Sequence, residues 1–182
     1  MIKLSMQALH RPTPQAYALQ AKLPIIVLLD SVRSMHNVGS LFRTADALGI
    51  QAIYLCGYTP LPPHKDIHKT ALGATETVPW QHMPNITNAI QAVTQAGYTV
   101  YAVEQTTTSI PLHQYTPTTQ PTAIVLGNEV DGVSIPALAL CHGAIEIPQL
   151  GTKHSFNVTV AAGIVLWKLA ENHLLLNTQL HV

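Results

Sequence analysis

The chain has 182 residues, of which 47% are hydrophobic and only 10% are charged. The apolar share is large enough for a packed core, so the composition excludes a disordered chain and a coiled coil. Nine Lys and Arg residues balance nine Asp and Glu residues, so no overall positive field indicates nucleic acid as the partner.

Short apolar runs alternate with amphipathic segments from residue 24 onward. Continuous apolar runs predict buried strands, and apolar residues that recur every three to four positions predict helices. In the first half of the chain, the expected elements are a strand at 25–29, a helix at 40–48 closed by Gly49, a strand at 52–55, a loop at 59–69 and a helix at 85–95. In the second half they are a strand at 98–103, a surface connection at 106–121, a strand at 123–126, a short helix at 134–140, a strand at 144–147 and a long helix from 156 to about 175.

This alternation predicts an α/β fold with a mostly parallel sheet and helices on both faces. Residues 24–182 are expected to form a single domain. Residues 1–23 are expected to form an irregular or weakly helical arm, because Pro12 and Pro14 interrupt it. The arm has several basic residues, and two roles remain open for it: contact with RNA or packing against a second copy of the chain.

Polar residues follow three of the expected strands directly, at 30–43, 127–134 and 148–157. Open parallel sheets bind ligands at the carboxyl ends of their strands. Any one of these clusters is compatible with an ordinary turn. Three of them, each with Asn, Ser and Gly and two also with Arg or Glu, indicate one composite site.

Several common types of site are excluded. No G-x-G-x-x-G follows the first strand, and the sequence has no P-loop and no G-x-S-x-G motif. His64 and His68 have the spacing of a metal-binding pair, but prolines beside them favour a loop and no third ligand is near, so no metal is expected. Cys56 and Cys141 are too few for a disulfide framework or a zinc site of cysteines alone.

The sequence also has no apparent secretory signal, and its longest apolar run, residues 158–167, is too short to cross a bilayer. We therefore expect a cytoplasmic protein without a membrane partner.

The three polar clusters contain recognisable motifs. The first reads N-V-G-S-L-F-R-T-A at 37–45, and the second reads L-G-N-E-V-D-G-V-S at 126–134. The third reads I-P-Q-L-G at 147–151, followed by S-F-N-V at 155–158. Together they resemble the three motifs of the SpoU/TrmH class of RNA 2′-O-ribose methyltransferases, within the SPOUT superfamily. Gln149, Phe156 and Thr159 depart from the residues common in that class, which have Met, Leu and Ser there.

The resemblance implies a domain whose C-terminal part is tied into a deep trefoil knot, and a homodimer with its active site near the interface. It implies S-adenosylmethionine as the methyl donor and a ribose 2′-hydroxyl of tRNA or rRNA as the acceptor. The cofactor is expected to lie mainly against backbone groups. The positions expected to bind it are Leu126, Gly127, Ile147, Leu150, Ser155 and Phe156.

Methyl transfer to a hydroxyl needs an aligned donor, loss of a proton and stabilisation of the developing negative charge. Arg43 is expected near the start of its helix, where it holds a phosphate and stabilises the alkoxide, since a guanidinium is a poor base. Its alternative is a structural salt bridge to Asp46 or Glu129.

The resemblance adds four residues to the catalytic set, and each also has a structural alternative. Asn37 is expected to orient the ribose or Arg43, or else to cap a turn before Gly39. Glu129 is expected to hold Arg43 or Asn37 in place, or else to be a solvated loop carboxylate. Ser155, in an N-cap position, and Asn157 begin the long helix and are expected near the substrate, or else only cap it.

An RNA substrate requires a local basic patch, because the chain as a whole is neutral. The expected RNA contacts are Arg33, His36, Arg43, Lys65 and Lys69, on loops that face the site. A tRNA is favoured over rRNA, since a tRNA loop presents splayed bases to a single compact domain. Two alternatives remain open: a SPOUT enzyme that methylates a base nitrogen, and a non-catalytic RNA-binding or assembly factor that retains the fold.

Overall fold

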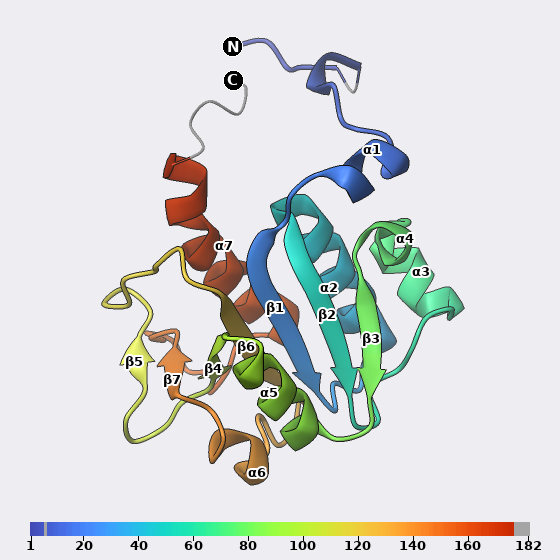
Figure 1. Cartoon of the computed structure of the whole chain (residues 1–182). Coiled ribbons are helices and arrows are strands. Elements are labelled where there is room, and N and C mark those ends of the chain that lie inside the picture. The colour runs from blue at the N-terminus through green and yellow to red at the C-terminus, as the bar shows by residue number, and fades with distance from the viewer. Residues whose placement is uncertain (6, 177–182) are drawn as a thin grey trace.

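The computed structural model describes residues 1–5 and 7–176. The last residues of the predicted domain, 177–182, and Met6 of the arm lie outside the described residues. The described chain forms one seven-stranded sheet in which every pair of neighbours is parallel, in the order β3-β2-β1-β6-β4-β7-β5 (Figure 1). The strands are β1 (Leu23–Asp30), β2 (Ile50–Cys56), β3 (Trp80–Met83), β4 (Thr99–Val103), β5 (Ile110–Pro111), β6 (Thr122–Gly127) and β7 (Gly143–Glu146).

Helices cover both faces of this sheet, as the alternation of segments predicts. On one face, α2 (Met35–Leu48), α3 (Lys65–Ala71), α4 (Ala74–Thr77) and α7 (Val158–Leu176) share a core with Val27 and Leu29. On the other, α5 (Ile86–Gln95) and α6 (Ile135–Leu138) pack on Ile26 and Leu28. Successive residues of β1 therefore enter opposite cores, which explains its unbroken apolar run. The predicted α/β class with a mostly parallel sheet is confirmed.

The helix that contains the first motif begins earlier than the sequence predicts. α2 begins at Met35 and not near Ser40, because the Ser34 hydroxyl caps it by accepting a hydrogen bond from the backbone N–H of Asn37 at 3.3 Å. Gly39 therefore lies inside the helix, where a Cβ would come within 2.2 Å of the Ile67 carbonyl on α3. The glycine permits close packing of α2 against α3. The predicted end is confirmed, with Gly49 at φ 65°.

The predicted loop at 59–69 is wrong for its second half, because α3 begins at Lys65. His64 caps this helix: its Nδ1 accepts a hydrogen bond from the backbone N–H of Asp66 at 3.2 Å. The prolines precede the helix and do not interrupt it. Two short strands also lie where none was predicted: β3 at the edge beside β2, and β5 within the surface connection at 106–121.

The long C-terminal helix begins at Val158, two residues later than predicted. Its first turn is capped by Asn157, whose Oδ1 accepts a hydrogen bond from the backbone N–H of Thr159 at 2.9 Å. The predicted N-cap position of Ser155 is therefore wrong. No helix of the described chain is both long and apolar enough to cross a membrane.

The N-terminal arm is partly ordered against the domain. It contains a 3-10 turn at Gln7–Leu9 and the helix α1 (Pro14–Leu19), in which Pro14 occupies the first turn and so begins the helix. The Tyr17 hydroxyl donates a hydrogen bond to the Asp46 carbonyl at 2.7 Å, and the Lys22 ammonium lies 2.9 Å from the centre of the Tyr17 ring. The hydrogen bond from Tyr17 to Asp46 holds α1 beside the end of α2.

Candidate functional site

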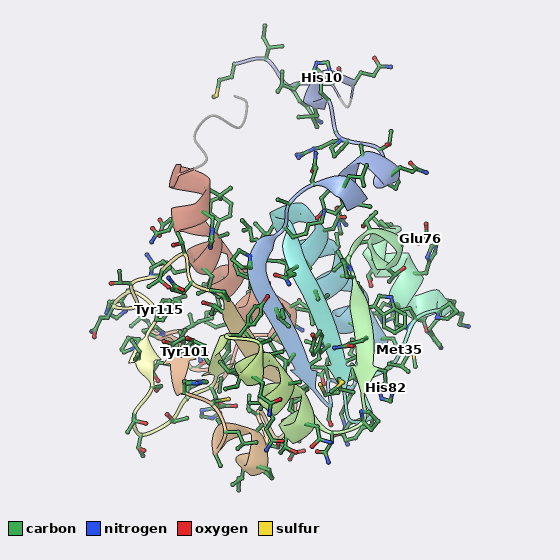
Figure 2. The ribbon with its side chains drawn as sticks, in the orientation of Figure 1. His10, Met35, Glu76, His82, Tyr101 and Tyr115 are labelled. Carbon is green, nitrogen blue, oxygen red and sulfur yellow. The ribbon has the colours of Figure 1, made fainter. Side chains whose placement is uncertain are left out.

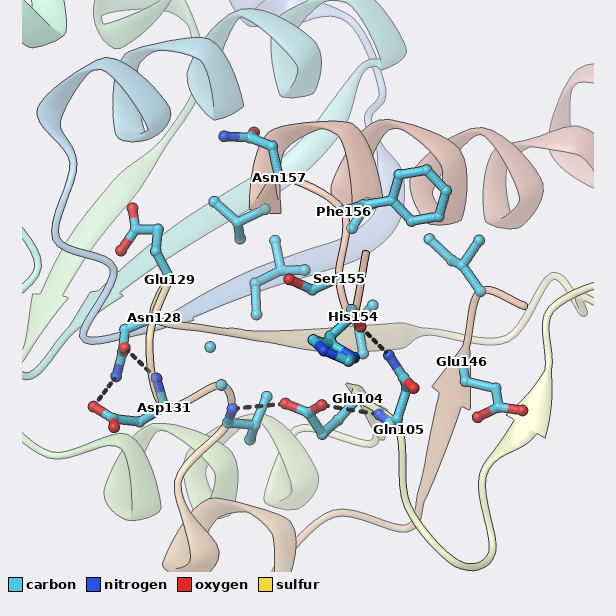
Figure 3. Close-up of a pocket in the computed structure, with 18 of the residues that line it drawn as sticks. Glu104, Gln105, Asn128, Glu129, Asp131, Glu146, His154, Ser155, Phe156 and Asn157 are labelled. Atoms are coloured by element: carbon cyan, nitrogen blue, oxygen red, sulfur yellow. Dashed lines mark hydrogen bonds between the residues drawn. The ribbon is translucent and has the colours of Figure 1, made fainter. Parts of the chain in front are cut away.

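A cavity of about 710 Å³ lies at the carboxyl ends of β4, β6 and β7, beside the start of α7 (Figure 3). Its floor is formed by apolar strand-end residues such as Leu126 and Ile145, and its rim by polar residues of the loops that follow. In an open parallel sheet this edge is where ligands bind. The second and third sequence motifs therefore meet around one cavity, as the sequence predicts.

The loop after β6 is folded tightly on itself. Asn128 and Gly132 exchange backbone hydrogen bonds at 3.1 Å, and the Asn128 Oδ1 accepts from the backbone N–H groups of Val130 and Asp131. A Cβ on Gly127 would lie 1.9 Å from the Gly132 carbonyl carbon, so only glycine fits there. At the base of the loop, the buried carboxylate of Asp30 accepts a hydrogen bond from the Ser134 N–H at 2.9 Å. The loop presents Glu129 in a defined position.

Glu129 is the centre of a hydrogen-bond network that joins all three motifs. Its Oε2 accepts from the Arg33 N–H at 3.0 Å, and its Oε1 accepts from the Ser34 N–H at 3.1 Å and the Asn37 Nδ2 at 2.7 Å. The Asn157 Nδ2 donates to the Asn37 Oδ1 at 3.3 Å. Glu129, Asn37 and Asn157 thus come together as predicted, and Glu129 holds Asn37 but not Arg43.

The charge of Glu129 is supported by these donors. Partial burial raises the pKa of its carboxyl group, but hydrogen bonds from Arg33, the Asn37 side chain, its own backbone and Ser34 outweigh that effect and leave the pKa below its usual value of 4.5. The carboxylate is therefore ionised at neutral pH and acts as an acceptor. The alternative for Glu129, a plain solvated loop carboxylate, is therefore wrong.

We expect Glu129→Gln to lower the free energy of unfolding at pH 7 by about 1 kcal/mol. The NH2 group of glutamine would face one of the three N–H groups that now donate to the carboxylate, so that hydrogen bond would be lost. The folded-state pKa is lowered, so the ionised carboxylate stabilises the fold above its usual pKa of 4.5 and this contribution is lost as the pH falls through the lowered value. Urea unfolding at pH 7 and pH 3 measures both effects. An equal difference between wild type and variant at the two pH values would contradict this role.

Arg43 lies apart from this network. Two turns along α2 from Asn37, it is exposed beside a second hollow that is lined also by Thr44, Gly163 and Trp167. Among the described residues it forms no salt bridge with Asp46 or Glu129, so that alternative is wrong. Because α2 begins at Met35, Arg43 is also not at a helix N-terminus, so its expected position near the start of its helix is wrong.

Five of the six positions expected to bind a cofactor line the 710 Å³ cavity, and one does not. Leu150 is 102% exposed and lies outside the lining residues. Phe156 is 42% exposed at the rim, and Ser155 lies in the cavity beside it (Figure 3). The members that line the cavity are Leu126, Gly127, Ile147, Ser155 and Phe156.

The residues expected to contact RNA lie on two packed helices and the turn before them. Arg33 and His36 are exposed around the start of α2, and Lys65 and Lys69 are exposed on α3. The Thr70 hydroxyl of α3 donates a hydrogen bond to the His36 carbonyl at 3.0 Å, which joins the two groups. The predicted loop location of Lys65 and Lys69 is wrong, but the structure brings these four residues to neighbouring elements.

Two polar residues of the cavity, Glu104 and Gln105, lie outside the clusters that the sequence identifies. They directly follow β4, which lies between β6 and β7 in the sheet. The strand-end rule that identified the other clusters applies equally to this strand, so the signal was present. In the part of the chain that the structure describes, no group of three His, Cys, Asp or Glu side chains is placed to hold a metal ion.

Comparison with known proteins agrees with these motifs. Residues 24–167 match the SpoU rRNA methylase family. The chain belongs to this family. It is 34% identical over 150 residues to a tRNA (guanosine(18)-2′-O)-methyltransferase of Thermus thermophilus, covering 82% of this chain and 76% of that protein. It is 31% identical over 154 residues to the 23S rRNA (guanosine-2′-O-)-methyltransferase RlmB of Neisseria meningitidis serogroup B, covering 85% of this chain.

Solved SpoU-family structures show the same fold. The TrmH/SpoU tRNA modifying enzyme of A. aeolicus has a TM-score of 0.79 at 25% identity, over 88% of this chain and 81% of that one. An AdoMet-bound rRNA methyltransferase from Sinorhizobium meliloti has a TM-score of 0.76 at 28% identity, over 85% of this chain and 61% of that one. The chain spans 61% of the Neisseria protein and 38% of a Synechocystis relative.

Proposed function

We propose that this SpoU-family chain is an S-adenosylmethionine-dependent methyltransferase that modifies a ribose 2′-hydroxyl of RNA. The observation that carries the proposal is the network in which Glu129, Asn37 and Asn157 join three motifs at the mouth of one cavity. The meeting of three motifs from distant segments at one cavity supports catalysis over a fold retained without it.

The charge of the cavity supports S-adenosylmethionine as its ligand. Four carboxylates line it, and no Lys or Arg is among its described lining residues. Such a cavity disfavours phosphate-bearing cofactors and favours a ligand with a net positive charge. S-adenosylmethionine has two positive groups, a sulfonium and an ammonium, and one carboxylate, so its net charge is positive. Its adenine can lie on the apolar strand ends. The four carboxylates are Glu104, Glu129, Asp131 and Glu146.

The protein residues would perform three tasks. When bound, the sulfonium supplies an electrophilic methyl group. Asn37, fixed by Glu129, and Asn157, which caps α7, would orient the ribose through their amide groups. Arg43 would stabilise the alkoxide that forms as the hydroxyl loses its proton, with an RNA phosphate or water as the acceptor.

Arg43 can perform this task only if a second copy of the chain brings it to the cavity, and we propose a homodimer for that reason. On α7, Val160, Ile164 and Trp167 form a stripe that is 48%, 37% and 59% exposed. This stripe adjoins the hollow that contains Arg43. A surface of this kind is typical of an interface between copies, and we propose that this interface brings Arg43 to the partner's site.

We further propose that RNA approaches over the face formed by Arg33, His36, Lys65 and Lys69, while the acidic cavity holds the cofactor. The basic residues would contact phosphates, which explains how a neutral chain binds RNA. Residues 24–182 would act as one catalytic domain, with the arm at 1–23 beside it, in the cytoplasm. The knot implied by the resemblance would involve the segment that leads to α7.

The substrate class is proposed to be tRNA, and the relatives include enzymes named for tRNA and for rRNA. Among the described residues, the helical face described above gathers four of the expected RNA contacts, and such a face suits a splayed tRNA loop. We expect the purified protein to methylate bulk tRNA in preference to rRNA. Mapping of the 2′-O-methyl nucleotide after incubation with each RNA measures this, and a mark confined to rRNA would overturn the choice.

A calorimetric titration with S-adenosylmethionine tests the cofactor assignment separately from catalysis. Saturable binding of one molecule per chain supports the proposal. Binding of RNA without any binding of S-adenosylmethionine would instead support a non-catalytic RNA-binding factor. A methyl group on a base nitrogen would support the remaining SPOUT alternative.

A further inference from the structure

The end of β4 lines the cavity between the ends of β6 and β7. The Glu104 N–H donates to the Ile145 carbonyl of β7 at 3.1 Å, so Glu104 continues the pairing of β4 and β7 by one residue. β4 also pairs with β6 on its other side. The strands on both sides lead into loops with family motifs, whereas the residues after β4 belong to none of the three motifs. Glu104 and Gln105 therefore sit between the two loops that form the cavity.

The Glu104 carboxylate holds the loop after β6. Its Oε2 accepts a hydrogen bond from the Val133 N–H at 3.0 Å, and its Oε1 accepts from the Gln105 N–H at 2.9 Å (Figure 3). Gly132, at φ 70°, packs directly against it, since a Cβ there would lie 2.3 Å from Oε2. The carboxylate thus fills the space beneath the loop and fixes its backbone.

Gln105 holds the loop after β7. Its Nε2 donates a hydrogen bond to the His154 carbonyl at 2.8 Å, and the Gln149 Nε2 donates to the same carbonyl at 3.2 Å. His154 directly precedes Ser155 and Phe156, which line the cavity. One backbone carbonyl is therefore held from two directions, and this fixes the entry of the chain into α7.

We propose that Glu104 and Gln105 are positioning residues that hold the two motif loops at the separation required to bind the cofactor. The proposal rests on the proposed function, because it concerns the same cavity. Neither side chain needs to touch reacting atoms: Glu104 acts through Val133 and Gln105 acts through His154. The pair forms a link across the cavity floor, from the second motif to the third.

Two substitutions test the link. Glu104→Gln keeps the size of the side chain but turns a donor toward one of the two N–H groups. Gln105→Ala removes only the bond to His154. We expect each variant to raise the KM and the Kd for S-adenosylmethionine about tenfold, with kcat at saturating cofactor within about threefold of wild type, because each loses one or two hydrogen bonds of modest strength. Titration calorimetry and steady-state kinetics measure these values.

Two control variants remove the same side-chain types elsewhere. Glu76→Gln changes a residue of α4, on the other side of the molecule from β5 and β7 (Figure 2). Gln95→Ala changes a residue at the exposed end of α5. Both are expected to bind cofactor as wild type does. Because Glu104→Gln also removes one of the four carboxylates of the cavity, Gln105→Ala, which changes no charge, decides whether the link positions the loops. The same variant tests the link if Glu104→Gln does not fold.

The outcomes separate this inference from the proposed function. If wild type binds S-adenosylmethionine and both variants bind it equally well, Glu104 and Gln105 do not position the loops, and the proposed function stands. A fall in kcat with an unchanged KM would also overturn the inference. If wild type itself does not bind S-adenosylmethionine, the proposed function fails before the variants are compared.

Discussion

Arg43→Ala is expected to reduce turnover by about 10²- to 10³-fold while the Kd for S-adenosylmethionine stays within about twofold of wild type. The guanidinium stabilises charge that develops mainly in the transition state, so its removal affects kcat and not cofactor binding. Its position outside the 710 Å³ cavity explains why the cofactor is not affected. Single-turnover methylation and calorimetry measure the two quantities. Turnover like that of wild type would contradict the role.

A mixture of this variant with a second one shows whether Arg43 serves the active site of its own chain or that of the partner. Asn157→Ala is expected to impair the cavity and leave Arg43 intact. When inactive Arg43→Ala and Asn157→Ala are mixed and allowed to exchange subunits, each mixed dimer has one complete site, so roughly a quarter of wild-type activity should return. No recovery, after exchange is verified, would show that Arg43 does not serve the partner's site.

Trp167→Glu is expected to separate the dimer and abolish turnover. Trp167 is 59% exposed on α7 beside Val160, Ile164 and the hollow that contains Arg43. A buried aromatic residue at the centre of an interface is often a hot spot, and a carboxylate there would remain unpaired, so we expect dimerisation to weaken by about 100-fold or more. Sedimentation at micromolar concentration measures this, with wild type as a dimer.

Leu72→Glu is the matched control for that variant. Leu72 is 67% exposed at the end of α3, away from the α7 stripe. The substitution therefore introduces the same charge at another exposed apolar residue. It is expected to remain dimeric. A wild-type protein that sediments as a monomer at micromolar concentration would contradict the interface itself.

The sequence was sufficient to predict elements whose cause is local. Residues close together in the sequence determine the strands β1 and β6 through their apolar runs and the helix α5 through its amphipathic pattern. They also determine the end of α2 through its glycine. The grouping of Glu129 with Asn37 and Asn157 was also predictable, because parallel strands bring their carboxyl ends to one edge of the sheet. The family motifs identified which polar residues meet there.

Other features depended on contacts between distant segments. Gly39 and the prolines before Lys65 suggested breaks in regular structure, yet Gly39 packs against Ile67 and the prolines precede a helix capped by His64. β3 is short and mostly exposed, so it has no apolar run and becomes a strand only by pairing with β2. The bonds of Glu104 and Gln105 depend on loop conformations that no periodic pattern encodes.

The separation of Arg43 from the cavity could not be inferred from its motif, since both Asn37 and Arg43 belong to the same run of nine residues. The helix that begins at Met35 places Asn37 in its first turn and Arg43 two turns away. One lies by the Glu129 network and the other beside Trp167. This separation is the reason for the proposal that two copies of the chain build the active site.

The most direct test of the proposed activity is methyl transfer from S-adenosylmethionine labelled in its methyl group to RNA, followed by digestion to nucleosides and mass spectrometry. The label is expected in a 2′-O-methylated nucleoside, in amounts that grow with time for wild type and are reduced at least about 100-fold for Arg43→Ala. A label found only on a base, or no transfer to any RNA by a dimer that binds S-adenosylmethionine, would contradict the account.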